Sequence, residues 1–307
     1  MRARIALVTA REALALDPDM PPLVAALTAQ GARVETPCWD DPGVDWHRFA
    51  VAVLRSTWDY AERIDEFLAW AERCRHATHL LNPLEVVRWN TDKHYLLHLA
   101  KAKVPVVPTR FVEPGADTDA EFAAFLGGGD GSLSAGSVTE IADFVVKPSV
   151  GAGSRDAARY RRADADTARA HLRRLVTAER RSAMLQPYLD RVDDYGETAL
   201  MYLGGRYSHA IRKGPLLRVG DGLVTGLFAP EQITPRVPDA AELHVAAAAY
   251  AAIPFEPLLY ARIDLIRDAG GQPAVLELEM TEPSLFLEQA PASAAAYARA
   301  ILAQAAR

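Results

Sequence analysis

The sequence predicts an α/β protein in which an N-terminal parallel lobe is followed by further lobes. Strand and helix patterns alternate over residues 4–54, which is the rhythm of a parallel α/β unit. Near the other end, residues 261–280 read as two apolar strands joined by a tight Asp-Ala-Gly-Gly turn. A chain of 307 residues can bury a large core, and this length favours two or three lobes over one.

Composition and charge limit the classes of function. Hydrophobic residues make up 50% of the chain and charged residues 24%, as in ordinary globular proteins. The net charge of −6 would repel a phosphate backbone, so we expect no nucleic-acid partner. Cys38 and Cys74 lack a CxxC spacing, which argues against a disulfide scaffold or a structural zinc site. The apolar run at the start is too short for a signal peptide, and no stretch approaches a membrane span, so we expect a cytoplasmic protein.

The first 54 residues carry the pattern of the parallel lobe. Arg4–Thr9 reads as a buried strand, and Met20–Gly31 reads as an amphipathic helix that its final glycine ends. Arg33–Glu35 begins a second strand, and Phe49–Leu54 is a third, apolar strand. In parallel sheets of this kind, ligands bind just beyond the carboxyl ends of the strands.

Residues 55–60, Arg-Ser-Thr-Trp-Asp-Tyr, directly follow the third strand and are a candidate substrate shelf. Arg55, Ser56 and Thr57 would then bind substrate, with the guanidinium paired to a carboxylate and the aromatic residues forming a wall. Alternatively, a helix begins here, with Ser56 or Thr57 as its cap and Arg55 in solvent. Asp17 can join the same cleft, although a local turn explains it equally well.

Lys93 and Lys147 are candidate ligands of phosphate oxygens. Lys93 lies in the first turn of a helix that begins at residues 90–93, where the helix dipole disfavours a positive charge. A phosphate would offset that cost, and a solvated lysine is an equally good alternative. Lys147 ends the β-rich run Phe144–Pro148 and precedes small residues, Ser149–Ser154, whose N–H groups can surround an anion. This loop matches neither a Walker A motif nor a dinucleotide fingerprint, and a plain hairpin also explains it.

A hinge and two further strands follow. Pro187 interrupts the short apolar strand Met184–Leu189, which leaves backbone N–H and C=O groups free for a planar ligand such as a nucleobase. Glu197–Leu203 and Arg206–Arg212 then read as alternating strands joined at a Gly-Gly turn. The second of these strands ends on Arg212.

The C-terminal hairpin gathers three carboxylates. Asp264, Glu277 and Glu279 are separated by even steps within each strand, so all three can lie on one face. Acids placed together on an apolar sheet repel each other unless they share a cation, and oxygen ligands select a hard ion such as Mg²⁺. Arg262 shares this face and is available to a phosphoryl oxygen. The alternative is a solvated outer face of an antiparallel pair.

The order of these pieces resembles the ATP-grasp superfamily of carboxylate ligases, in particular its glutathione-synthetase-like and ribosomal-protein-glutamate-ligase-like branch. The resemblance extends from about Asn90 to the C-terminus, and its strength comes from six individually weak motifs in the family order. It implies the ATP-grasp fold, an N-terminal parallel α/β lobe and two α+β lobes that clasp ATP. It divides the chain into a substrate-side domain at 1–90, a central lobe with a Gly-rich lid at 91–187, and a C-terminal lobe with a magnesium site at 188–307.

The resemblance also implies roles for individual residues. In the family, the lysines that match Lys93 and Lys147 hold the phosphates, and the residues that match Asp264, Glu277 and Glu279 hold two Mg²⁺ ions. Glu279 stands where the family usually has Asn, which keeps an oxygen ligand but adds a charge. ATP binding is further assigned to Ser154, Gln186, Pro187, Tyr188, Leu189 and Glu197, and stabilisation of the transferred phosphoryl group to Arg212, Arg262 and Lys147.

The reaction implied by the resemblance is an ADP-forming C–N ligation. A small amino-acid-like substrate is activated as an acyl phosphate, which a nitrogen then captures. The run at residues 55–60 together with the two lysine motifs resembles a narrower group that includes the cyclo-ligase of D-cycloserine biosynthesis, which closes O-ureido-D-serine. A ligase that joins two separate molecules and a nucleotide-binding module without chemistry remain alternatives. Because ATP-grasp chains commonly self-associate, the resemblance also implies a homodimer.

Overall fold

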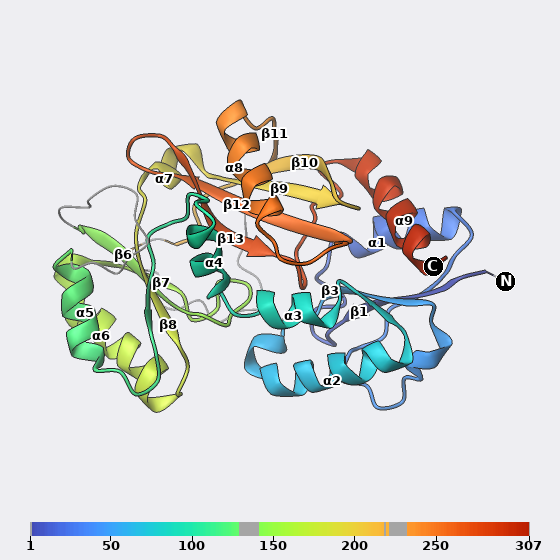
Figure 1. Cartoon of the computed structure of the whole chain (residues 1–307), viewed down its shortest axis with the longest axis horizontal. Helices are drawn as coiled ribbons and strands as arrows, with labels where there is room; N and C mark the ends of the chain where they lie inside the picture. The colour runs from blue at the N-terminus through green and yellow to red at the C-terminus, as the bar shows by residue number, and fades with distance from the viewer. Residues whose placement is uncertain (1, 129–140, 218, 221–231, 307) are drawn as a thin grey trace.

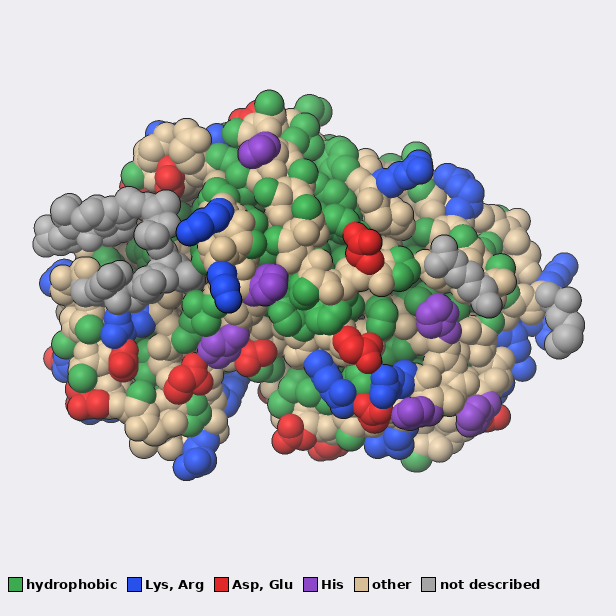
Figure 2. Space-filling view, viewed as in Figure 1, with side chains coloured by type: hydrophobic (Ala, Val, Ile, Leu, Met, Phe, Trp, Pro, Cys, Tyr) green, Lys and Arg blue, Asp and Glu red, His purple; other side chains and the backbone are tan. Residues whose placement is uncertain are grey.

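The computed structural model describes residues 2–128, 141–217, 219–220 and 232–306. Its strands form three sheets, each with helices packed against it, and these make up neighbouring lobes (Figure 1). The predicted α/β class is therefore confirmed. Across the face shown in Figure 2, acidic and basic side chains are interspersed rather than segregated by sign. Among the described residues, no helix has both the length and the apolar composition needed to cross a membrane.

The first sheet is parallel throughout, as the alternation of strands and helices predicts. Its third strand runs two residues beyond the predicted end, because Ser56 still pairs with Thr9 after a register shift at Arg55. In spatial order the strands are β2 (Arg33–Glu35), β1 (Arg4–Thr9), β3 (Val51–Ser56) and β4 (His79–Leu81). The helices of this lobe are α1 (Met20–Ala29), α2 (Ile64–Ala77) and α3 (Leu84–Asn90), with 3₁₀ turns at Trp46–Arg48 and Tyr60–Glu62.

The second sheet is antiparallel and is covered by two helices. Phe122, Phe144 and Leu172 pack between the helices and the sheet and make its core. In spatial order the strands are β5 (Arg110–Val112), β8 (Ala183–Pro187), β6 (Asp143–Pro148) and β7 (Ala158–Arg161). The helices are α5 (Thr118–Leu126) and α6 (Ala165–Arg173), with a 3₁₀ turn at Arg162–Asp164 and a π-helical turn at Arg174–Ala178.

The third sheet is also antiparallel and carries the predicted acidic hairpin. In spatial order its strands are β11 (Ile233–Arg236), β10 (Arg206–Lys213), β9 (Glu197–Leu203), β12 (Tyr260–Arg267) and β13 (Pro273–Glu279). The remaining helices are α4 (Tyr95–Lys101), α7 (Arg191–Tyr195), α8 (Ala240–Ala251) and α9 (Pro291–Ala305).

The register of the hairpin places the charged residues together. Arg262 lies directly opposite Glu279, and Asp264 lies directly opposite Glu277. Because alternate residues of a strand point to the same side, these four side chains share one face. The prediction that the three acids share a face of the hairpin is confirmed.

Two helices connect regions that are distant in the sequence. The last helix, α9, lies beside α1 of the first lobe, and Tyr297 and Ile301 share a core with Leu7 and Leu23 (Figure 1). Burying a side chain as large as Ile301 contributes roughly 1.5–3 kcal/mol. Helix α4, which lies within the predicted central lobe at 91–187, packs instead on the third sheet together with α8. The end of the chain therefore ties the third sheet to the first lobe.

Candidate active site

A cavity lies where the second and third sheets meet the loops of the first lobe. The second sheet contributes β6 and β8, the third contributes β9, β10 and the β12–β13 hairpin, and the segments that follow β3 and β13 complete the wall. The predicted residues that line this cavity are Lys93, Lys147, Ser154, Gln186, Pro187, Tyr188, Leu189, Glu197, Arg262, Glu277 and Glu279.

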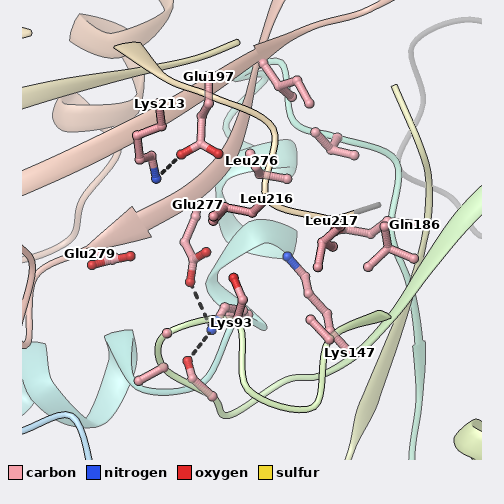
Figure 3. Close-up of a pocket in the computed structure, with 18 of the residues that line it drawn as sticks. Lys93, Lys147, Gln186, Glu197, Lys213, Leu216, Leu217, Leu276, Glu277 and Glu279 are labelled. Atoms are coloured by element: carbon pink, nitrogen blue, oxygen red, sulfur yellow. Dashed lines mark hydrogen bonds and ion pairs between the residues drawn. The ribbon is translucent and has the colours of Figure 1, made fainter. Parts of the chain in front are cut away.

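The two predicted lysines enter the cavity from different elements (Figure 3). The Nζ of Lys93 lies 3.0 Å from Glu277 Oε1 and donates to the carbonyl of Gly151 at 2.8 Å. Burial opposes its charge, but Glu277 outweighs burial and raises the pKa of Lys93. Lys147, near the end of β6, forms no ion pair with any described residue, and burial lowers its pKa. Lys147 is therefore a half-buried cation that faces the cavity without an ion-pair partner among the residues that the structure describes.

The loop of small residues after Lys147 is held in place by arginines. Ser154 and Asp156 have positive φ angles of 59° and 58°, which an L-residue adopts only under constraint. The Asp156 carboxylate accepts hydrogen bonds from Arg174 at 2.7 Å and Arg181 at 2.8 Å, and Arg181 also donates to the carbonyl of Val150 at 3.1 Å. These contacts fix the loop against the cavity.

The hinge after β8 forms an apolar end of the cavity. Gln186 donates through Nε2 to Thr109 Oγ1 at 2.8 Å, and the N–H of Tyr188 donates to the carbonyl of Asp143 at 2.9 Å. Pro187 has no N–H to donate, so the strand ladder stops at this point. The apolar side chains lining this end include Val107, Val145, Val192, Leu216, Leu217, Ile266 and Leu276.

The acids of the hairpin are each engaged with a cation. Asp264 is 1% exposed and lies beneath the cavity lining, where Arg262 Nε donates to its Oδ1 at 2.9 Å and Lys213 Nζ to its Oδ2 at 2.8 Å. Burial opposes its ionisation, but these two cations outweigh it and lower the pKa of Asp264. For Glu279, which contacts Arg262, burial prevails and raises the pKa to about 7. Glu277 is held ionised by Lys93 and Lys147, which lower its pKa against the effect of burial.

The donor set suits a hard divalent ion. All three acids supply oxygen, and the proximity of Glu277 and Asp264 helps to raise the pKa of Glu279, a repulsion that a cation would relieve. In the part of the chain that the structure describes, no three Asp, Glu, His or Cys side chains converge as metal ligands. The candidate ligands of such an ion are Glu277, Glu279 and Asp264, and each of them contacts a Lys or Arg side chain in this structure.

Lys213, which the sequence analysis missed, occupies the position expected of Arg212. Lys213 pairs opposite Glu197 across β9 and β10, contacts the Glu197 carboxylate and bonds to Asp264. Arg212 points to the other side of the sheet, where it donates to the carbonyls of Tyr195 at 2.8 Å and Asp194 at 3.0 Å. The expected position of Arg212 at the cavity is therefore wrong, because the strand extends one residue further and alternation brings its neighbour inward. Burial raises the pKa of Glu197 to about 8 despite Lys213.

The polar residues of the expected substrate shelf do not reach the cavity, whereas its aromatic residues Trp58 and Tyr60 line it. Arg55 is fully buried, 3.2 Å from Asp19 Oδ2 and 3.7 Å from Asp17 Oδ2, and it donates to the carbonyl of Pro283. Arg55 neither faces a substrate nor lies in solvent at a helix start, because β3 carries Arg55 and Ser56 into the interior. The predicted substrate residues that do not line the cavity are Arg55, Ser56, Thr57 and Asp17.

The cavity continues beyond Glu279 to a group that combines the aromatic wall expected at residues 55–60 with residues after β13 that the sequence analysis did not assign to the site. Trp58 and Tyr60, from the segment after β3, line it together with Glu282, Ser284 and Phe286, which follow β13. The Trp58 Nε1 donates to the carbonyl of Glu282 at 3.1 Å. No periodic pattern could have identified Glu282, because it lies in an irregular turn.

Comparison with known proteins identifies the family. Residues 5–82 match the family model described as the N-terminal domain of D-cycloserine synthetase DcsG. The cycloserine biosynthesis protein DcsG of Streptomyces lavendulae is 43% identical over 304 residues, which cover 97% of both chains. A crystal structure of D-cycloserine synthetase DcsG superposes with a TM-score of 0.89 at 41% identity, over 99% of this chain and all of that one.

More distant structures share the fold. A D-alanine–D-alanine ligase from Bacillus anthracis, solved with ATP, has a TM-score of 0.67 at 14% identity and covers 100% of this chain and 98% of its own. The ATP-grasp ligase PsnB, solved with a minimal precursor, Mg and ADP, has a TM-score of 0.61 at 18% identity over 99% and 98% of the two chains. The predicted ATP-grasp fold is thus confirmed. The chain belongs to the DcsG family of ATP-grasp ligases.

Proposed function

We propose that this protein is an ATP-dependent cyclo-ligase that converts O-ureido-D-serine to D-cycloserine. The observation that carries the proposal is the charge arrangement of the cavity: the acids of β13 line it together with Lys93, which pairs with Glu277, and Lys147, which forms no ion pair with any residue that the structure describes. An anion with a bound divalent cation, such as magnesium triphosphate, satisfies both sides at once. The 43% identity to the cycloserine biosynthesis protein DcsG supports the choice of substrate.

The nucleotide would lie along the cavity from the hinge to the hairpin. The apolar end at Gln186, Pro187, Tyr188 and Leu189 suits the adenine, with the backbone groups of the hinge beside its edge. Lys93, Lys147 and the N–H groups near Ser154 would neutralise the phosphates. Glu197 lies at the same wall and would contact the nucleoside.

Glu277, Glu279 and Asp264 would hold magnesium, and we propose two ions in accordance with the family resemblance. Bound magnesium neutralises charge on the β- and γ-phosphates and orients them. For Asp264 to take part, Lys213 and Arg262 must give up part of their present contacts with its carboxylate. Both cations would then be available to the transferred phosphoryl group.

The proposed chemistry has two steps. A carboxylate oxygen of the substrate attacks the γ-phosphorus and ADP leaves, while Lys147 and Arg262 stabilise the charge on the phosphoryl oxygens. The ureido nitrogen next to oxygen then attacks the acyl carbon, loses its proton, and expels phosphate to close a five-membered ring. Atom balance requires that the carbamoyl group then leave, with water, as carbon dioxide and ammonia. The loop at residues 149–154 would keep water from the acyl phosphate.

Three coarser expectations extend the proposal. From the resemblance we propose the division at residues 1–90, 91–187 and 188–307 and a homodimer. We also propose the expected cytoplasmic location. The mass of the protein in solution, measured by light scattering, tests the dimer directly.

The reaction is tested by incubating the protein with ATP, Mg²⁺ and O-ureido-D-serine. We expect one D-cycloserine, identified by mass spectrometry, for each ADP released in a coupled assay. Glu277→Gln should lower kcat by about 10²–10³-fold while the unfolding midpoint stays close to that of the wild type. ADP release that requires an added amine would instead identify a ligase of two molecules, and an absence of ADP would contradict the proposal.

A further inference from the structure

The cavity has a second end, opposite the hinge. The proposed function assigns no role to the residues that line this end. In Figure 3, Gln186 and Leu217 lie to one side of Glu277, and Glu279 lies to the other. The chain continues from Glu279 into an irregular loop at residues 280–287, which meets the segment after β3. Glu282 and Tyr60 belong to this second end.

Glu282 differs from the other acids at the cavity. It is only 7% exposed, yet it lines the cavity. Four neighbouring acids have cationic partners: Lys93 pairs with Glu277, Arg262 pairs with Glu279 and Asp264, and Lys213 pairs with Asp264 and Glu197. By contrast, no Lys, Arg or His among the described residues comes within ion-pair distance of Glu282. The hydroxyl of Tyr60, which is itself buried, hydrogen-bonds to the Glu282 side chain.

An unpaired carboxyl in such a place is costly for the empty protein. Removing a carboxylate from water without a cation is strongly unfavourable, and proteins normally pair such groups or keep them at the surface. A ligand that brings its own positive charge into the cavity removes this cost. The unpaired carboxyl is therefore complementary to a cationic group on a ligand.

The backbone around Glu282 is fixed before any ligand arrives. Trp58 holds the carbonyl of Glu282, and Arg262 donates to the carbonyl of Ser284 at 3.2 Å. On the buried side, the Asp19 carboxylate accepts the N–H groups of Leu285 at 2.6 Å and Leu287 at 2.7 Å. A carboxyl held on a rigid loop loses little freedom when it binds, which favours recognition of one group in one orientation.

We propose that Glu282, supported by Tyr60, binds the ammonium group of the amino-acid substrate. The inference rests on the proposed function and adds an orientation to it. With the ammonium at Glu282, the substrate carboxylate can face Arg262 and the lysines, where the phosphoryl group is transferred. The site thereby selects substrates with a free α-amino group and rejects analogues that lack one.

The test compares O-ureido-D-serine with its deamino analogue, 3-(ureidooxy)propanoic acid, which lacks only the ammonium. Dissociation constants are measured by calorimetry with Mg²⁺ and a non-hydrolysable ATP analogue present. We expect the wild type to bind the analogue roughly 10–100-fold more weakly than the amino acid. Glu282→Gln should lose about the same factor for the amino acid and leave the analogue within about threefold. Tyr60→Phe should weaken binding of the amino acid by a smaller factor and, like Glu282→Gln, leave binding of the analogue nearly unchanged.

The controls separate a binding role from a structural or metal role. Glu288→Gln makes the same chemical change on the exposed part of the same segment and should bind both compounds like the wild type. The ammonium site would be overturned if Glu282→Gln weakened the binding of both compounds equally, left the preference for the amino acid unchanged, or shifted the Mg²⁺ requirement. It would also be overturned if the wild type bound neither compound. ADP release is measured in parallel. Preferred binding of the amino acid without ADP release would contradict the cyclo-ligase function but support the ammonium site. D-cycloserine formation without that preference would support the cyclo-ligase function but contradict the ammonium site.

Discussion

Two groups of buried charges contact the loop at residues 280–287, and they differ in what surrounds them. The anchor cluster is closed to solvent and consists of Arg55, Asp17 and Asp19. The cavity cluster opens into the cavity and consists of Lys93, Lys147, Lys213, Arg262, Asp264, Glu277 and Glu279. In the anchor cluster, Asp19 accepts hydrogen bonds from Arg55 and from three backbone N–H groups of the loop. In the cavity cluster, Lys147 forms no ion pair among the described residues.

The difference between the two clusters shows that burial of charge does not by itself identify a functional site. Both clusters place Arg and Asp in the interior at less than a tenth exposed. In the anchor cluster the charges are paired with each other and with backbone groups, which fixes structure. In the cavity cluster several acids share the same cations, and Lys147 forms no ion pair with any residue that the structure describes, so its charge is available to a ligand. The following variants test this distinction.

The largest expected effect is on stability, from the anchor cluster. Asp19→Ala removes the acceptor of three N–H groups and leaves Arg55 buried without its nearest partner, so we expect a loss of about 3–5 kcal/mol in the free energy of unfolding. Urea unfolding measures this loss. A loss below about 1 kcal/mol would mean that the anchor cluster does not hold the loop.

The next largest expected effect is a loss of turnover when a residue of the cavity cluster is replaced. Lys147→Met removes an ammonium whose pKa burial already lowers, so the protein should be as stable as the wild type or slightly more stable. Turnover should fall by about 10²–10³-fold, because the phosphoryl oxygens lose a cation. Steady-state kinetics and thermal unfolding are compared on the same preparation. A fall in Tm with retained turnover would assign Lys147 a structural role.

A matched pair of variants tests which face of β10 serves the site. Lys213→Met should reduce kcat by about tenfold or more, since Lys213 contacts both Glu197 and Asp264. Arg212→Met removes hydrogen bonds to two carbonyls outside the cavity and should cost about 1–2 kcal/mol of stability, with kcat unchanged. If Arg212→Met lowered kcat and Lys213→Met left kcat unchanged, Arg212 and not Lys213 would serve the site, as the sequence predicted.

The last effect is a pH dependence of the stability of the nucleotide-free protein. Burial raises the pKa of Glu282 to about 8, above its ordinary value of 4.5, so the folded state binds more protons than the unfolded state between about pH 5 and 8. This contribution to stability is present at low pH and is lost as the pH rises towards 8, by at most about 1.4 kcal/mol per pH unit. Glu282→Gln stays neutral and should show a shallower decline between pH 5.5 and 8 in urea unfolding. An identical slope in both proteins would contradict the raised pKa.

The sequence predicted the parts of the site that depend on local spacing. Even steps in the hairpin placed Glu277 and Glu279 on one face, and a strand end followed by small residues indicated Lys147. One residue of strand length decided between Arg212 and Lys213, because a shift of one residue exchanges the two faces. Local sequence patterns do not locate the end of a strand to within one residue.

Contacts between distant segments were not predictable. Arg55 and the carbonyl of Pro283 are 228 residues apart in the chain, so nothing near Arg55 indicates that it is sealed in the interior. Glu282 lies in an irregular turn, and its character depends on burial against Tyr60 from another lobe. The elements of each lobe follow from the sequence, whereas the identity of the groups at the lobe interface requires the tertiary structure.

The central claim is that the cavity cluster binds a magnesium-bound triphosphate. A calorimetric titration with MgATP, repeated on Lys147→Met and Glu282→Gln, tests it most directly. We expect saturable binding and a raised Tm for the wild type, binding weakened at least tenfold by Lys147→Met, and unchanged affinity in Glu282→Gln. Absence of both binding heat and stabilisation in the wild type, with Mg²⁺ in excess, would contradict the account.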